Sequence, residues 1–96
     1  MPATAPATGE VLAAKLLALG EQLRAQRKRL GVSATTAAEA AGMSRVTLHR
    51  IERGEPSVTM GAYLNAAAAL GLALGVVEPQ PPAPLRSQGA GVPKRI

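Results

Sequence analysis

The chain of 96 residues carries eleven lysines and arginines against six acidic residues, which gives a formal net charge of +5, and it contains no cysteine. Its length allows one small domain with flexible ends. The lack of cysteine excludes disulfide bonds and thiolate metal sites, whereas the modest positive charge suits a phosphate-bearing partner without demanding one.

The apolar residues favour closely packed helices. They make up 47% of the chain, but phenylalanine and tryptophan are absent and Tyr63 is the single aromatic residue. A core must therefore be built mainly from alanine and aliphatic residues, and alanine-rich faces allow helices to approach closely. A core of this size supplies limited stability, so association with a second copy would add to it.

The N-terminal third predicts a disordered lead followed by a long helix. Residues 1–9, MPATAPATG, show no apolar periodicity. Helical patterning begins near Glu10, with Thr8 as the expected N-cap. Gly20 then leaves two interpretations open: one continuous helix over 10–30, or a separate arm over 10–19 for a partner subunit. One stripe of leucines follows helical spacing: Leu12, Leu16, Leu19, Leu23 and Leu30.

The same segment argues against a secretory signal and against a membrane span. The apolar run VLAAKLLALG has no basic region before it, and Lys15 interrupts it. It is also far shorter than the roughly 20 apolar residues that cross a bilayer. We therefore expect a cytoplasmic protein with no membrane partner.

Residues 33–54 predict two short helices joined by a tight turn. Ser33 is the expected N-cap of the first, and the turn runs through Ala41-Gly42-Met43-Ser44. Ser44 caps the second helix, which spans 44–52. Two helices arranged in this way suit the DNA major groove, which is wide enough to admit one α-helix.

The C-terminal part predicts a further helix, a short strand and a tail. The helix begins around Ser57 to Thr59 and ends at Leu70. The apolar run LALGVV, residues 72–77, then favours a strand that pairs with the same strand of a second copy, or else an irregular segment that covers the core. Residues 78–96 are rich in proline and glycine and predict a disordered tail, so the domain spans 10–77. The candidate dimerisation residues are Leu72, Leu74, Val76 and Val77.

Residues 19–72 resemble the helix–turn–helix domain of the Cro/C1-type, or XRE-type, family, which includes phage repressors and several antitoxins. The most specific part is the run from Gly42 to Gly54, GMSRVTLHRIERG. The resemblance implies a compact, all-α, lambda-repressor-like fold of four or five helices. It also implies that helix 44–52 is the recognition helix and enters the major groove.

The resemblance assigns DNA contacts to individual residues. An arginine can present two parallel donors to guanine O6 and N7. Val46 either touches a thymine methyl group or packs against the preceding helix. The amides at the two helix starts favour phosphate. The candidate base contacts are Arg45, Val46, Thr47 and Arg50, and the candidate phosphate contacts are Ser33, Thr35, Ser44, His49 and Arg53.

Arg27 and Glu52 receive a structural role from the same resemblance. In this family the end of the first helix passes the end of the recognition helix, and an arginine and a glutamate often pair there. We therefore expect a buried ion pair between them. The chain departs from the family at Ala34, where many members carry a glutamine, and at Thr35 and Thr36, where acidic residues are common.

Together these features predict a transcriptional regulator, a repressor, that binds a palindromic operator in double-stranded DNA as a homodimer. Half-sites should lie roughly 10 base pairs apart. The alternative is an antitoxin that neutralises a toxin through the tail and represses its own operon. A helical interaction module would instead lack salt-dependent DNA binding. An enzyme, a cofactor and a metal site are not expected, because His49 is the only histidine and no carboxylate pair shares a plausible pocket.

Overall fold

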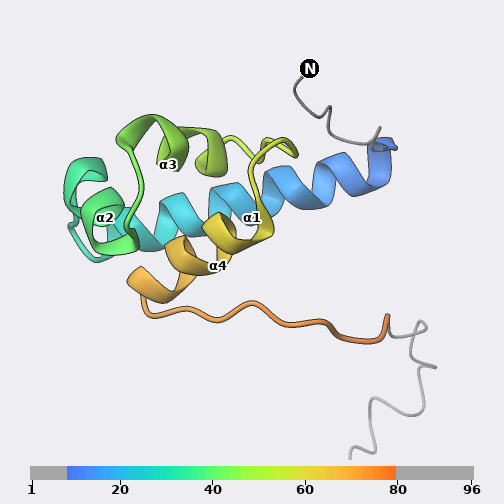
Figure 1. Cartoon of the computed structure of the whole chain (residues 1–96). Coiled ribbons are helices and arrows are strands. Elements are labelled where there is room, and N and C mark those ends of the chain that lie inside the picture. The colour runs from blue at the N-terminus through green and yellow to red at the C-terminus, as the bar shows by residue number, and fades with distance from the viewer. Residues whose placement is uncertain (1–8, 80–96) are drawn as a thin grey trace, which may run out of the picture.

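The protein folds into four helices, as seen in a computed structural model that describes residues 9–79. The predictions of a disordered lead and tail fall largely on 1–8 and 80–96, which lie outside the described residues. Figure 1 shows α1 running through the middle, with α3 on one side, α4 on the other and α2 beside its C-terminal end. The expected all-α fold is confirmed. The helices are α1 Glu10–Arg29, α2 Ala34–Ala41, α3 Arg45–Glu52 and α4 Met60–Ala69.

Helix α1 is continuous across Gly20, so the interpretation as one long helix is confirmed. Its N-cap is Gly9, not Thr8, and no side chain caps this end. The first turns extend beyond the other helices (Figure 1). The leucine stripe is therefore only partly buried: Leu23 lies in the core, whereas Leu12 and Leu30 are exposed.

Gly20 marks the place where α1 meets the end of α3. A Cβ atom there would lie 2.5 Å from the carbonyl oxygen of Ile51 and 2.7 Å from that of Glu52. Gly54, just after α3, approaches α1 as closely, because its Cβ would lie 2.6 Å from the carbonyl oxygen of Leu16. Gly54 also has a φ of 70°, a conformation that favours glycine. Two glycines thus allow backbone to pack directly on backbone.

The three shorter helices begin at hydroxyl caps. Ser33 Oγ accepts a hydrogen bond from the Thr36 amide at 3.1 Å, and Ser44 Oγ accepts one from the Thr47 amide at 3.0 Å. Thr59 caps α4 in the same way through the Ala62 amide. Both predicted serine caps are confirmed. Each cap satisfies a backbone amide that has no partner within its helix.

The core joins aliphatic residues of α1 and α3 to alanine faces of α2 and α4. Leu23, Leu48 and Ile51 are its largest fully buried side chains. Alanines allow α2 to pack closely against α4, as the composition predicts. Those alanines are Ala37 and Ala38 of α2 and Ala66 and Ala67 of α4.

Tyr63 fixes the loop between α3 and α4. Its ring is buried in the core, and its hydroxyl donates a hydrogen bond to the backbone carbonyl of Glu55 at 2.8 Å. Burial, together with the nearby Glu55 carboxylate, raises the pKa of Tyr63 above its ordinary value. The folded protein therefore favours the neutral phenol of Tyr63.

The segment after α4 runs back along the domain without regular secondary structure over 72–79 (Figure 1). Leu72 and Leu74 are half-buried against the core, whereas Val76 and Val77 are exposed. The single chain thus forms the irregular alternative. The strand needs a second chain to pair with, and it stays a prediction. Among residues 9–79, no helix is long and apolar enough to cross a membrane.

The close contact of α1 with the end of α3 at Gly20 and Gly54, which we call the glycine crossing, predicts that Gly20→Ala lowers the stability of the fold. The added methyl group has no room against the end of α3, and such overpacking costs about 1–3 kcal/mol. Gly61→Ala is the matched control, because Gly61 lies in α4 with nothing within 4 Å of its Cβ position. Alanine there should raise stability by about 0.5–1 kcal/mol. Urea unfolding of both variants checks this, and equal stability of the two would contradict the close crossing.

Candidate nucleic-acid interface

The packing of α3 decides which of its side chains face solvent. Leu48, Ile51 and Glu52 lie on one side of this eight-residue helix and are buried. The opposite side is left without a partner among residues 9–79 and carries a run of polar and basic residues. Because α3 is short and its buried side is occupied, the outward direction of the remaining side chains is settled.

The residues predicted to read bases lie on this outward side. Arg45 and Arg50 are exposed. Val46 is 61% exposed, so most of its side chain is accessible to a ligand. Thr47 is half-buried, and its hydroxyl accepts a hydrogen bond from the Ser44 hydroxyl at 3.0 Å. Three of the four side chains are therefore fully presented, and the fourth also supports the helix cap.

The predicted phosphate contacts gather at the starts of two helices. Ser33 and Ser44 are the N-caps of α2 and α3, and Thr35 is exposed two residues after Ser33. Neither helix has an acidic residue in its first turn. The positive end of each helix dipole is therefore not neutralised by its own side chains, which favours an anion.

Thr36 is a residue of this surface that the sequence alone did not single out. Its hydroxyl accepts a hydrogen bond from Ser33 at 3.0 Å, as Thr47 does from Ser44. The Ser-x-x-Thr spacing that is repeated at both helix starts is the sequence pattern that could have indicated this role of Thr36. A capping box has a glutamate at this position that accepts from the backbone amide of the N-cap residue, whereas this threonine accepts from the serine hydroxyl and adds no negative charge.

His49 and Arg53 lie at the other end of α3, and both are exposed. The Arg53 guanidinium donates two hydrogen bonds to one carboxylate oxygen of Glu55, at 2.8 and 3.1 Å. An exposed pair of this kind contributes about 0–1 kcal/mol. Arg53 can therefore exchange this partner for a phosphate at small cost.

A buried ion pair holds the end of α3 against α1. Arg27 Nε donates to Glu52 Oε2 at 2.6 Å, and Arg27 Nη2 donates to Glu52 Oε1 at 3.1 Å. Arg27 is 9% and Glu52 is 6% exposed. The hydrogen bond to Glu52 raises the pKa of Arg27 above its ordinary value, against the opposing effect of burial. The geometry of the predicted pair is as expected.

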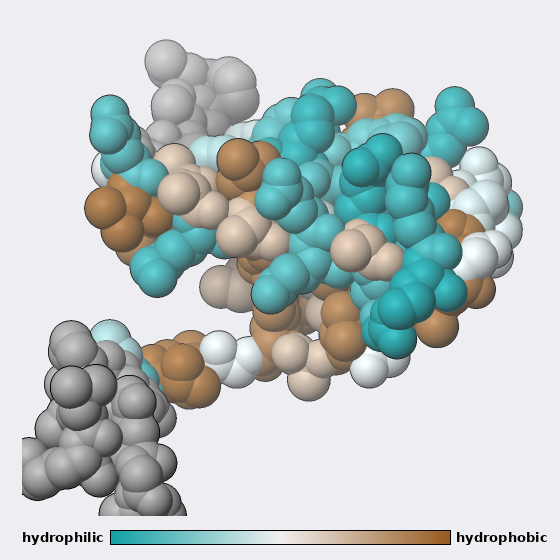
Figure 2. Space-filling view, turned by 180° about the vertical axis from the view of Figure 1, so that it is seen from behind, coloured by the Kyte–Doolittle hydropathy of each residue, from teal (hydrophilic) through white to brown (hydrophobic). Residues whose placement is uncertain are grey.

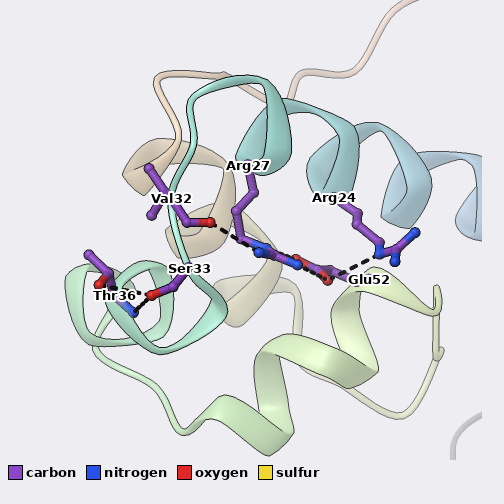
Figure 3. A network of polar contacts seen from close by, with 6 residues as sticks. All are labelled: Arg24, Arg27, Val32, Ser33, Thr36 and Glu52. Atoms are coloured by element: carbon purple, nitrogen blue, oxygen red, sulfur yellow. Dashed lines mark hydrogen bonds and ion pairs between the residues drawn. The ribbon is translucent and has the colours of Figure 1, made fainter.

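Arg27 also reaches a third element. Its Nη1 donates to the carbonyl oxygen of Val32 at 3.0 Å, directly before the Ser33 cap of α2 (Figure 3). One guanidinium therefore joins α1, the end of α3 and the start of α2. Arg24 approaches the same carboxylate at 4.0 Å from the opposite side in Figure 3 and stays largely exposed.

The described residues form a surface suited to binding. No three histidine, cysteine or acidic side chains between 9 and 79 come together as a metal-ligand set. Every buried side-chain nitrogen or oxygen within that range has a hydrogen-bond partner. The accessible polar groups include hydroxyls at the starts of α2 and α3 and the guanidinium groups of Arg45 and Arg50 on the outward side of α3.

Comparison with known proteins identifies the family. Residues 18–79 match a family described as a helix–turn–helix domain. The chain belongs to this helix–turn–helix family. A comparison with curated proteins found no match. The expected resemblance to the XRE type is confirmed, and it places the chain among DNA-binding transcription regulators.

One solved structure supports the same fold in a regulatory protein. The restriction–modification controller protein C.AhdI from Aeromonas hydrophila is 34% identical to this chain, with a TM-score of 0.56. The match covers 62% of this chain and 89% of the controller protein. The likeness thus extends over nearly the whole length of that protein and over somewhat less than two thirds of this chain.

The buried pair predicts a large difference between two glutamates. Glu52→Gln leaves Arg27 buried without its counter-charge, and breaking such a pair costs about 3–5 kcal/mol. Glu55→Gln breaks the exposed pair with Arg53 and should cost less than about 1 kcal/mol. Thermal unfolding at neutral pH measures both. Equal midpoints for the two variants would show that the Arg27–Glu52 pair does not stabilise the domain.

Proposed function

We propose that the protein is a repressor that binds a palindromic operator as a homodimer and reads its bases with α3. The observation that carries the proposal is the outward side of α3, where Arg45, Val46 and Arg50 are accessible while Glu52 is turned inward to Arg27. The helix–turn–helix family supplies the class of ligand. The controller protein's name describes a regulatory role, which supports regulation by this chain as well.

Arg45 and Arg50 are the residues that read sequence. A guanidinium can donate two parallel hydrogen bonds to guanine, and a good bidentate contact discriminates by about 1–3 kcal/mol against the wrong base. Val46 adds an apolar contact suited to a thymine methyl group. Thr47 acts on a base or a phosphate with the hydroxyl that Ser44 already orients.

Phosphate contacts fix the position of α3 on the duplex. The capped starts of α2 and α3 offer amides and hydroxyls without a nearby acid, and Arg53 and His49 add groups at the far end of α3. Contacts of this kind carry no base preference but set register and orientation. Ala34 cannot donate the hydrogen bond that a glutamine would, so Thr35 and the Ser33 cap have to hold this end.

Dimerisation follows from the geometry of the operator. Two recognition helices must reach successive major grooves roughly 34 Å apart. Val76 and Val77 are 102% and 83% exposed, and apolar surface of this kind is suited to a second copy. Leu72 and Leu74 already contact their own core, so they support the interface from beneath.

The base readers are tested by selecting bound sites from random duplexes. The wild-type chain should select a palindrome with half-sites roughly 10 base pairs apart. Arg50→Ala and Arg45→Ala should each relax the preference at one position per half-site and weaken binding to each half-site by about 5–150-fold. Arg29→Ala is the control, since Arg29 lies on α1 and contacts Gln26. Unchanged preference in both α3 variants would remove the assignment.

The antitoxin alternative depends on residues 78–96, most of which lie outside the described part of the chain. It therefore stays a prediction from the sequence.

A further inference from the structure

Exposed apolar side chains are concentrated at one end of the molecule. Nine large hydrophobic residues between 9 and 79 are exposed. Seven of them lie on the first turns of α1, on the first half of α4 or on the segment after α4. These seven are Val11, Leu12, Leu17, Met60, Leu64, Val76 and Val77.

The first turns of α1 are an addition to the family domain. The family match begins at residue 18, and α1 begins at Glu10, so about two helical turns precede the domain. We call residues 10–17 the arm. The arm extends past the other helices (Figure 1) and carries Val11, Leu12 and Leu17 in exposed positions. Leu16 of the arm packs against the core of its own chain and Leu17 lies beside His49 and Arg53, so Val11 and Leu12 are the apolar arm residues that contribute least to this fold.

An apolar groove lies beside the arm. Figure 2 shows an open space between the first turns of α1 and the segment that leads to the residues drawn in grey, with hydrophobic residues along that segment. Two adjoining cavities lie here, with volumes of about 410 and 600 Å³. Nearly all of the side chains that line them are apolar. Their shared walls come from Leu19 of α1, Met60 of α4 and Leu74 of the last segment.

We propose that the arm of one copy packs into this groove of a second copy, and that the two arms exchange across a two-fold axis. The inference rests on the proposed homodimer and names the parts that form it. A two-fold interface requires each chain to offer both halves of the contact. This chain offers both, because an unpartnered apolar helix end and an apolar groove lie next to each other on it.

Charge complementarity favours a second copy of this chain as the occupant. Lys15 lies three residues from Leu12 and four from Leu19, which places it on the groove-facing side of α1. Val76 lines the groove, and the exposed Glu78 follows it two residues later. No ion pair joins Lys15 to Glu78 within the described chain. In the exchanged pair, Lys15 of each chain meets Glu78 of the other.

The interface leaves the recognition surface free. In Figure 1, α3 lies on one side of α1 and the segment after α4 lies on the other. Residues of the groove come from α1, the loop between α3 and α4, α4 and the last segment, and none comes from α3. Two copies joined through the arms can therefore both present α3 to DNA.

A matched pair of arm variants tests the apolar contact. Leu12→Glu places a charge on the groove-facing side, whereas Ala14→Glu places the same charge on the same turn of the other side. Sedimentation equilibrium of the full chain should show a dimer dissociation constant raised at least tenfold by Leu12→Glu and changed less than threefold by Ala14→Glu. Helical content should stay the same in both, since both positions are exposed. Equal effects of the two variants would overturn the proposal.

Charge reversal shows whether the contact joins two chains. Lys15→Glu and Glu78→Lys should each raise the dissociation constant about tenfold, because each creates two like-charged pairs per dimer. An equimolar mixture of the two variants should form heterodimers about as tight as wild type, since both pairs are then restored across the interface. A contact within one chain, or occupation of the groove by residues 80–96, predicts no rescue in the mixture.

The DNA readout separates this inference from the proposed function. Leu12→Glu should retain wild-type affinity for a single half-site and lose cooperative binding to the palindrome. Retained cooperativity would place the dimer contact elsewhere and leave the proposed repressor intact. If the wild-type chain did not bind the palindrome at all, the proposed function itself would be wrong.

Discussion

The guanidinium of Arg27 is the group on which the DNA-binding geometry depends. It is buried between three elements and contacts one residue of each neighbour: the Glu52 carboxylate at the end of α3 and the Val32 carbonyl before α2. Loss of either contact would leave a buried charge or a buried carbonyl with fewer partners, which is costly. The helix that we propose reads bases and the helix whose N-terminus we propose binds phosphate therefore share one anchor.

The glycine crossing explains why that anchor can work. Gly20 and Gly54 let the backbone of α1 touch the backbone at the end of α3. The helices are then close enough for Arg27 to hold Glu52 with a bidentate bond, at 2.6 and 3.1 Å. A bulkier pair at these positions would separate the elements and lengthen those bonds. Close packing and the buried ion pair thus depend on each other.

The local features of the fold were predictable because short-range chemistry determines them. Serine at 33 and 44 caps a helix through its own side chain, and the alanine-rich composition predicts close helices. The role of Gly20 was not predictable, because its neighbours are residues 51–54, far along the chain. The sequence did not assign roles to Arg24 and Thr36 for related reasons. Arg24 gains a role only when the fold brings Glu52 beside it. In the sequence, Thr36 is only a position where an acidic residue is missing, and its bond to Ser33 appears only in the structure.

Our two proposals assign two tasks to two faces of the molecule. The outward side of α3 presents guanidinium groups and hydroxyls, whereas the far side of α1 presents the arm and an apolar groove. Such a division lets affinity for DNA be adjusted by the contacts of α3 and cooperativity by contacts between copies. Of the two, the DNA face follows the family, and the arm lies before the family domain.

Amide chemical-shift mapping with the selected operator duplex tests the central claim most directly. The largest changes should fall on residues 33–36 and 44–53, together with the side-chain Nε–H of Arg45 and Arg50, and residues 60–70 should change little. Changes concentrated on α4, with α3 unaffected, would contradict the assignment of α3 as the helix that reads DNA.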